Sequence, residues 1–276
     1  MRLNCPEMKL NIDKIVSVLN AEMIHKGKNA SFEKLFFDSR KVEAGSVFIA
    51  ISGTQLDGHA FVDQAVKNGA LLIIIEKNID NYAEGVNYLK VKNSSIALAK
   101  LASEIYGNPS EKIKLVGVTG TNGKTTIVSL LYGLMEELGY KAGLLSTVRN
   151  YIHNTEIKAT HTTPDPVQIN KLMADMLDEG CEYCFMEVSS HAVAQNRVEG
   201  LKFDGAVFTN ITHDHLDYHK SFSNYIKAKK AFFDRLDREA FALLNSDDKN
   251  SAFTVQNSHA AKKSYSMKSI SDYRVR

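Results

Sequence analysis

The chain has 276 residues, of which 44% are hydrophobic, and its formal net charge at pH 7 is +2. This length allows a large core and suggests two domains. Because Lys and Arg are scattered among Asp and Glu, the sequence excludes a chain-wide basic surface for nucleic acid.

The apolar stretches, the start of the chain and the cysteines all favour a cytoplasmic location. No apolar stretch is long enough for a membrane helix, and the start of the chain does not have the pattern of a secretory signal. Three cysteines do not make a disulfide framework. We therefore expect a cytoplasmic protein, not bound to membranes and monomeric, whose partners are small molecules.

The first hundred residues predict a small α/β domain. Ser39 lies on the first polar turn, where a hydroxyl can serve either a ligand or the turn itself. Ser94 is expected to cap a helix. The predicted elements are a helix over 10–20, two short β-type runs within 37–51, a helix over 59–69, strands over 70–75 and 88–91, and a helix over 94–106.

A break in the pattern follows at residues 107–110, which read Gly-Asn-Pro-Ser. Gly and Pro together interrupt regular structure, and such segments often separate domains. We place the boundary here, with one domain over 1–107 and a second over 108–276.

The second domain opens with the stretch around which the chain is organised. A β-branched apolar run over 114–119 leads into a glycine turn and then an apolar-periodic helix from 127 to 138. This layout can direct backbone N–H groups at a phosphate, and a plain tight turn is the alternative. The strict phosphate-loop pattern has a glycine where this chain has Val118. The residues of the predicted nucleotide site are Gly120, Thr121, Asn122, Gly123, Lys124, Thr125 and Thr126.

Further strands and helices carry polar residues at their ends. A strand is predicted over 142–146, a hairpin or loop over 148–159 and a helix over 167–178. Thr162 and Thr163 precede that helix, where hydroxyls either cap it or hold an anion.

The next strand, over 184–187, delivers Glu187 to the edge of a parallel sheet where ligands bind, and a carboxylate there can hold Mg²⁺. Arg197 follows on a loop or short helix and has the planar fork that suits an anionic substrate.

Two patterns could instead indicate a zinc site. His213, His215, Asp217 and His219 alternate after a strand over 206–209, as in hydrolases that activate water on zinc. Tyr218 separates the last two of them, however, and no later histidine cluster supplies the remaining ligands. The cysteines at 181 and 184 have no second pair, and the latter lies in an apolar run typical of a core.

The chain is predicted to continue with a helix over 221–238 and a strand over 241–244. Residues 251–276 show no closing helix, and the sheet is expected to stop early. Lysines in the middle of the helix are ordinarily a solvated face.

In their order, these stretches resemble the Mur ligases of peptidoglycan synthesis, most closely the branch that adds the third peptide residue. The loop of that family is similar to residues 120–126 and lacks the earlier glycine. The matching stretches are 38–40, 57–59, 120–126, 162–166, 187–191 with Gln195 and Arg197, and 213–219 with the region of Lys229.

The resemblance implies a fold and a reaction. The fold would be a small α/β domain for the UDP-substrate followed by an incomplete parallel-sheet ATPase domain, without the family's C-terminal domain. ATP would phosphorylate a carboxylate of UDP-MurNAc-L-Ala-D-Glu, and a diamino acid, meso-diaminopimelate or L-lysine, would attack the acyl phosphate. Such a partial chain could bind nucleotide without ligating.

The resemblance also implies roles for individual residues. The loop and Lys124 would hold ATP, and two Mg²⁺ ions would be held by Thr125 with Glu187 and by His215 with a carbamylated lysine. That lysine would be Lys229, with Lys230 as the alternative. The implied substrate residues are Ser39, Thr162, Thr163, Ser189, Gln195 and Arg197.

Two other functions stay open from the sequence. A sister ligase of the folylpolyglutamate or cyanophycin type would share the loop and magnesium residues but not the 38–40 stretch. A noncatalytic binding module is the second alternative.

Overall fold

The computed structural model describes residues 8–53, 56–159, 161–212 and 216–274. Contacts divide the chain between Asn108 and Pro109 into two compact units, which we call the N-terminal unit and the central unit. Within these described ranges, no helix combines the length and the apolar character needed to cross a membrane.

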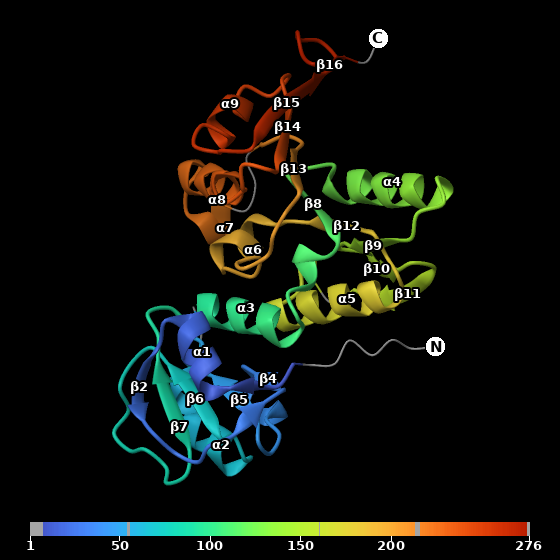
Figure 1. Ribbon diagram of the computed structural model, residues 1–276. Helices are drawn as coiled ribbons and strands as arrows, with labels where there is room; N and C mark the ends of the chain where they lie inside the picture. The colour runs from blue at the N-terminus through green and yellow to red at the C-terminus, as the bar shows by residue number, and fades with distance from the viewer. Residues whose placement is uncertain (1–7, 54–55, 160, 213–215, 275–276) are drawn as a thin grey trace. The chain divides into compact units, whose positions relative to one another are not determined.

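The N-terminal unit is built on a five-stranded sheet (Figure 1). Its order is β2 (Glu22–His25), β7 (Asn87–Lys90), β6 (Leu72–Ile75), β5 (Val47–Ile49) and β4 (Leu35–Phe36). All neighbouring pairs are parallel except β2 with β7. Every side chain of β6 is buried, because a strand with four consecutive apolar residues needs cover on both faces. The remaining elements are β1 (Leu10–Asn11) paired with β3 (Ser31–Phe32), α1 (Ile12–Leu19), η1 (Ser39–Lys41), η2 (Gly58–Phe61), α2 (Val62–Lys67) and α3 (Ser94–Ile105).

The cap of α3 differs from the sequence prediction. Asn93, not Ser94, caps the helix, and its side chain accepts the N–H of Ile96 at 2.9 Å. The N–H and hydroxyl of Ser94 both donate to Glu76 Oε1 at 2.6 Å. The serine that a local pattern predicted as the cap is instead bound by the carboxylate of Glu76, 18 residues away in the chain.

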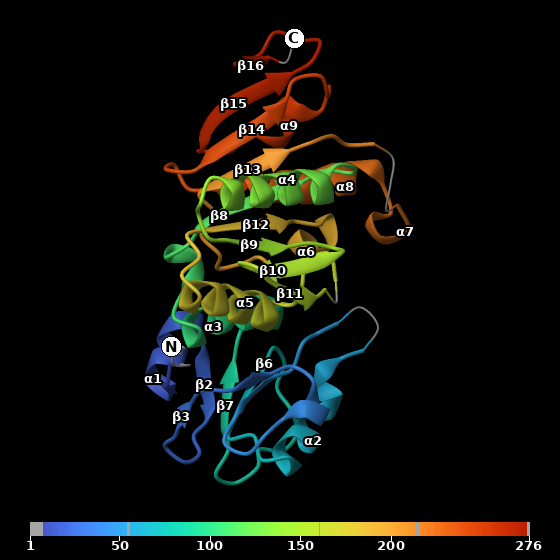
Figure 2. The same ribbon diagram turned by 90° about the vertical axis from the view of Figure 1, so that its right-hand side faces the viewer.

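The central unit contains a nine-stranded sheet, seen nearly face-on in Figure 2. The order is β11 (Thr155–Lys158), β10 (Arg149–Ile152), β9 (Ala142–Leu145), β12 (Tyr183–Glu187), β8 (Lys114–Thr119), β13 (Gly205–Phe208), β14 (Phe241–Asn245), β15 (Ala261–Ser266) and β16 (Tyr273–Arg274). In this spatial order, all strands from β9 onward are parallel to one another. At the other end of the sheet, β10 and β11 form an antiparallel hairpin, and β10 is antiparallel to β9.

Helices cover both faces of the central strands (Figure 1). Because side chains alternate along a strand, Phe185 packs on the face of α4 (Lys124–Glu137) and Met186 packs in the opposite core. That opposite core contains residues of α5 (Pro166–Asp178), α6 (Ser190–Ala194) and α8 (Phe222–Asp234). Shorter elements are η3 (Pro109–Glu111), α7 (Leu216–His219) and α9 (Ser251–Thr254).

The sheet continues beyond the last strand predicted from the sequence, 241–244. β15 pairs in parallel with β14, starting at Ala261 opposite Phe241, and β16 pairs with β15. The first half of β15 is exposed and includes Lys262 and Lys263. Because this strand lies near the edge of the sheet, it lacks the apolar run by which a buried strand is recognised.

The ends of the strands locate the site. β8 lies between β12 and β13, and the parallel strands β8, β9, β12 and β13 all finish at the same edge of the sheet. Ligands of open parallel sheets bind at this edge. Residues that follow these strands are therefore close in space although they lie far apart in the sequence.

Candidate functional site

The glycine loop between β8 and α4 has the predicted layout of strand, turn and helix. Gly123 is the N-cap residue of α4 and has a φ of 87°, in the left-handed region. Two loop N–H groups are held by Asn210: Thr121 donates to its carbonyl oxygen at 2.8 Å, and Asn122 donates to Oδ1 at 3.0 Å. Asn210, two residues after the end of β13, thus fixes the shape of the loop.

Gly120 and Gly123 make a testable contrast. A Cβ at Gly120 would lie 1.8 Å from Thr209 Oγ1, whereas a Cβ at Gly123 would meet nothing within 4 Å. We expect Gly120→Ala to lower the free energy of unfolding by about 2 kcal/mol, because backbone and core must shift. Gly123→Ala should cost only about 1 kcal/mol, from its positive φ. Urea unfolding of both variants checks this; equal losses would contradict it.

A cavity of about 380 Å³ opens beside the loop. It brings together nine of the residues predicted from the sequence: Gly120, Lys124, Thr125, Thr162, Thr163, Glu187, Ser189, Arg197 and Lys229. Four further residues line it that sequence reasoning gave no role: Thr147, His161, Ser190 and His191.

The other predicted residues of the central unit that the structure describes are not among those that line the cavity. Thr121, Asn122, Gly123 and Thr126 belong to the loop and the start of α4, and Thr126 is exposed. Gln195 is not among the described residues that line the cavity, and its Oε1 accepts from Arg197, which does line it. His215 lies outside the described residues, as does His213.

Two lysines meet at the loop. Lys124 Nζ donates to the carbonyl oxygen of Gly120 at 3.0 Å and to that of Thr121 at 2.9 Å. Lys229 Nζ, almost fully buried, donates to the same Gly120 oxygen at 2.8 Å and lies 4.7 Å from the ring centre of Tyr225. Two cations therefore converge on one carbonyl, which makes this end of the cavity attractive to anions.

Lys230 is oriented differently. Its Nζ is held by both carboxylate oxygens of Asp234, at 2.7 and 2.8 Å, on the same helix. The cavity is lined by Lys229 and not by Lys230.

Arg197 organises the opposite side of the cavity. Its guanidinium donates to Gln195 Oε1 at 2.9 and 2.6 Å and to the carbonyl oxygen of Thr163 at 2.8 Å. Burial lowers the pKa of this guanidinium, yet arginine keeps its charge at any physiological pH. The hydroxyl of Thr163 donates to the Glu187 carbonyl oxygen at 2.8 Å and accepts the Ser189 N–H at 3.1 Å. A cation and several hydroxyls thus surround the space where an anionic substrate would fit.

The donor set suits magnesium better than zinc. Within the described residues, no group of three or more His, Cys, Asp or Glu side chains could hold a metal ion. Cys181 and Cys184 are buried, and burial raises the pKa of the Cys181 thiol to about 11. The hydroxyl of Thr125 and the carboxylate of Glu187, by contrast, line the cavity together. Mg²⁺ prefers such hard oxygen ligands and is commonly held by one or two carboxylates plus substrate phosphates.

Ser39 lies in the N-terminal unit and is buried. Its hydroxyl donates to Gln64 Oε1 at 2.9 Å, and its carbonyl oxygen accepts from Asn68 Nδ2 at 2.8 Å. In this structure the side chain therefore holds η1 against α2.

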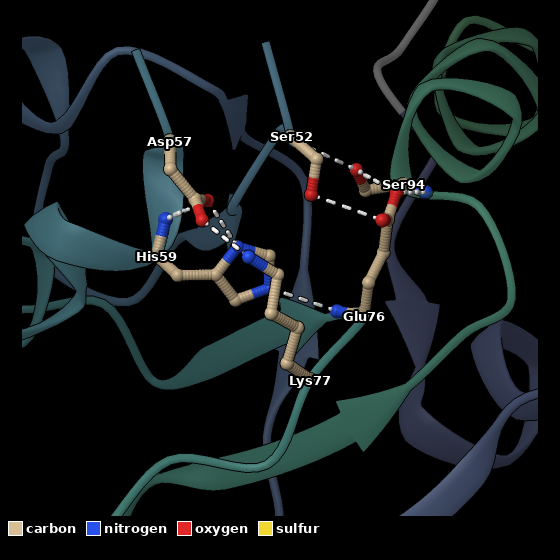
Figure 3. Close-up of polar contacts among 6 residues, drawn as sticks. All are labelled: Ser52, Asp57, His59, Glu76, Lys77 and Ser94. Carbon is tan, nitrogen blue, oxygen red and sulfur yellow. Dashed lines mark hydrogen bonds and ion pairs between the residues drawn. The ribbon is translucent and has the colours of Figure 1, made fainter.

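A polar network surrounds the Asp57-Gly58-His59 stretch of the same unit (Figure 3). His59 Nε2 accepts the Glu76 N–H at 2.9 Å, so the imidazole proton lies on Nδ1, which donates to Asp57 Oδ1 at 2.6 Å. The other Asp57 oxygen accepts from Lys77 Nζ. The hydroxyl of Ser52 donates to Glu76 Oε2 at 2.9 Å. The network ties the segment after β5 to the end of β6.

This network should make the free energy of unfolding depend on pH in the acidic range. Hydrogen bonds from Lys77 and His59 hold the Asp57 pKa well below its usual range. The folded state thus favours the ionised carboxylate, a contribution that is present above pH 4 and is lost as pH falls further. Asp57→Asn should lower stability at pH 7 and flatten the decline of stability below about pH 4. Urea unfolding at several pH values tests this, with exposed Asp80→Asn as the control; identical acid profiles for Asp57→Asn and the unsubstituted protein would contradict it.

The fold and the cavity together define a class. A parallel sheet whose central strand leads through a glycine loop into a helix, with a lysine and hydroxyls at the helix start, is the arrangement of phosphate-loop proteins.

The chain belongs to the Mur ligase family. The sequence pattern of the Mur ligase middle domain matches residues 118–275, and that of the Mur ligase family catalytic domain matches residues 32–106. Both the α/β fold class and the family predicted from the sequence are confirmed.

Several relatives are similar over most of the chain. A UDP-N-acetylmuramoyl-L-alanyl-D-glutamate–2,6-diaminopimelate ligase from Phocaeicola vulgatus is 49% identical over 265 residues, which are 96% of this chain and 55% of the relative. The ligase of the same name from Cytophaga hutchinsonii is 54% identical over 240 residues, 86% of this chain and 49% of the relative. The chain thus spans about half the length of the curated relatives it matches.

Solved structures show the same fold. A structure of a UDP-N-acetylmuramoyl-L-alanyl-D-glutamate–2,6-diaminopimelate ligase superposes with a TM-score of 0.80 at 26% identity, over 97% of this chain and 54% of that chain. MurF from Acinetobacter baumannii is 19% identical with a TM-score of 0.65, over 94% of this chain and 54% of that chain, which shows a shared fold alone.

Proposed function

We propose that the chain carries the nucleotide-binding and UDP-precursor-binding parts of an ATP-dependent ligase that adds 2,6-diaminopimelate to UDP-MurNAc-L-Ala-D-Glu. One observation carries the proposal: a single cavity joins Lys124 and Thr125 of the glycine loop to Glu187, Lys229 and Arg197. The names of the relatives support this acceptor over L-lysine, which the sequence left open.

The chemistry explains why these residue types are needed. ATP would phosphorylate the free carboxylate of the precursor, and the amine of the diamino acid would displace phosphate from the acyl phosphate. Negative charge grows on the transferred phosphoryl group, so the site must supply cations and oriented donors before the reaction starts. Lys124 and the N-terminal end of α4 would hold the β- and γ-phosphates.

Magnesium would bind at the oxygen donors of the cavity. Thr125 and Glu187 would hold one Mg²⁺, while His215 and a carbamylated Lys229 would hold a second. These ions would neutralise phosphate charge when bound.

The other substrate residues divide between the two units. Thr162, Thr163, Ser189, Gln195 and Arg197 would contact the muramyl peptide. Ser39 of the N-terminal unit would contact the UDP-sugar, which requires its hydroxyl to exchange the bond to Gln64 for a ligand. We further propose that the protein is a cytoplasmic monomer that does not bind nucleic acid.

A phosphate-release assay tests the proposal. The chain is incubated with MgATP, UDP-MurNAc-L-Ala-D-Glu and one acceptor: 2,6-diaminopimelate, L-lysine or L-glutamate. Released phosphate is measured, and the mass of the product is determined by mass spectrometry. Phosphate and tripeptide product with diaminopimelate alone are expected. Release with glutamate only would contradict the assignment and indicate a sister ligase.

A binding-only role is the second candidate, because the residues that line the cavity would bind nucleotide whether or not phosphate is released. Calorimetric titration distinguishes the two roles. Binding of MgATP and of the UDP-precursor without any phosphate release would establish the binding role, whereas no binding of either ligand would contradict both.

A further inference from the structure

The carboxylate of Glu187 is held from two directions by one residue. Glu187 ends β12 and has no exposed surface. The Thr147 N–H donates to Oε1 at 2.8 Å, and the Thr147 hydroxyl donates to Oε2 at 3.2 Å. Both residues line the cavity. A buried carboxylate needs such donors, since it has left water.

The backbone around Thr147 is held in place by hydrogen bonds of its turn. It follows β9, the parallel neighbour of β12, in the turn that leads to β10. Within this turn the hydroxyl of Ser146 donates to the Arg149 carbonyl oxygen at 2.6 Å, and the Ser146 N–H donates to Asn150 Oδ1 at 3.1 Å. Ser146 and Asn150 are both buried. These bonds fix the backbone of the turn, and they therefore fix the position from which Thr147 donates to Glu187.

Two donors on opposite oxygens restrict rotation of the carboxylate. Each oxygen keeps an acceptor position that is not used by Thr147, and Thr125 lines the same cavity. Partners of this kind around a metal ligand typically change metal affinity 10- to 100-fold when they are removed.

We propose that Thr147 is the positioning residue that orients the Glu187 carboxylate toward a divalent cation bound with the nucleotide. The proposal rests on the nucleotide and magnesium site proposed above. In this proposal Thr147 does not itself contact the ion, and its loss weakens binding of the metal without weakening metal-free binding of the nucleotide.

The test separates a metal effect from a general structural one. Binding of a non-hydrolysable ATP analogue is measured by calorimetry at increasing Mg²⁺ and with no Mg²⁺, for Thr147→Val, Thr147→Ser and the exposed control Thr155→Val. Thr147→Val keeps the backbone donor and loses the hydroxyl. The variant should therefore need on the order of ten-fold more Mg²⁺ to reach half of the Mg²⁺-dependent gain in affinity for the analogue. Its metal-free affinity should be unchanged. Thr147→Ser and Thr155→Val should match the unsubstituted protein.

A double variant checks that the effect passes through Glu187. In a Glu187→Gln background, adding Thr147→Val should leave the Mg²⁺ dependence unchanged, because the carboxylate that it orients is gone. The proposal is overturned if Thr147→Val has the Mg²⁺ dependence of the unsubstituted protein, if Thr147→Ser is as impaired as Thr147→Val, or if metal-free binding weakens equally.

Failure of the proposed function would look different. If the unsubstituted protein itself bound the analogue with no help from Mg²⁺, the magnesium site would be rejected, and the role of Thr147 with it. If the unsubstituted protein showed the Mg²⁺ effect and Thr147→Val left it unaltered, only the role of Thr147 would be rejected.

Discussion

Lys124→Ala should weaken binding of MgATP on the order of 100-fold. The lysine begins α4, lines the cavity and now donates to two loop carbonyls, Gly120 and Thr121, from which it can turn to a phosphate. A charge-assisted hydrogen bond is worth about 1.5–3 kcal/mol, and each 1.4 kcal/mol is a factor of about ten in affinity. Calorimetric titration with MgATP measures the loss directly.

Lys114→Ala is the matched control, because Lys114 lies at the opposite end of β8 and contacts Tyr183. It should bind MgATP like the unsubstituted protein, and both variants should unfold at nearly the same urea concentration. Unchanged nucleotide affinity in Lys124→Ala would remove the basis for a phosphate site at the glycine loop. Equal weakening in Lys114→Ala would show that the effect is not local.

Local signals in the sequence were enough to find this loop. The buried strand, the two glycines and the helix that begins at Lys124 lie within two dozen residues, and each follows from backbone and side-chain preferences of its own segment. Glu187 could be placed as well, since an apolar strand has an identifiable C-terminal end. The order of motifs then identified the family, which the matched domain patterns confirm.

Contacts between distant segments could not be predicted in the same way. Thr147 lies 40 residues from Glu187, and only the parallel pairing of β9 with β12 brings them together. The rule that ligands gather where parallel strands end would have pointed to Thr147 had the order of strands been known. The prediction that Ser94 caps α3 failed for the same reason, because Ser94 donates to Glu76, which follows β6 in the sequence.

The two lysines at Gly120 suggest why one of them would change its charge. Lys124 and Lys229 both donate to the same carbonyl oxygen, so two ammonium groups repel each other at close range. If Lys229 lost a proton, its neutral amine could form an N–C bond with CO₂ and release a second proton to solvent. The resulting carbamate would replace one cation by an anion that attracts Lys124 and offers oxygen to a metal ion. Lys230 forms an ion pair with Asp234 instead and does not line the cavity.

Lys229→Met should therefore remove the carbamate and slow phosphate release on the order of 100-fold or more, the scale on which loss of a preorganised electrostatic group slows an enzyme. The carbamate carbon should be visible by NMR when the unsubstituted protein is supplied with ¹³C-bicarbonate. Methionine matches the four-atom stem of the lysine and can pack beside Tyr225, but it has no amine. Added bicarbonate should not restore activity to Lys229→Met, whereas formate should restore part of the activity of Lys229→Ala, in which the shorter side chain leaves room for a small carboxylate.

Two lysines of the same helix provide the controls. Lys230→Arg keeps a cation beside Asp234 and has no amine to modify, and Lys227 is exposed, so Lys230→Arg and Lys227→Ala should both retain the carbamate signal and the activity. A signal that persists in Lys229→Met, or disappears in Lys230→Arg, would move the modification to another lysine. Normal phosphate release by Lys229→Met would show that neither a carbamate at this position nor the bond from its amine to Gly120 is needed for the reaction.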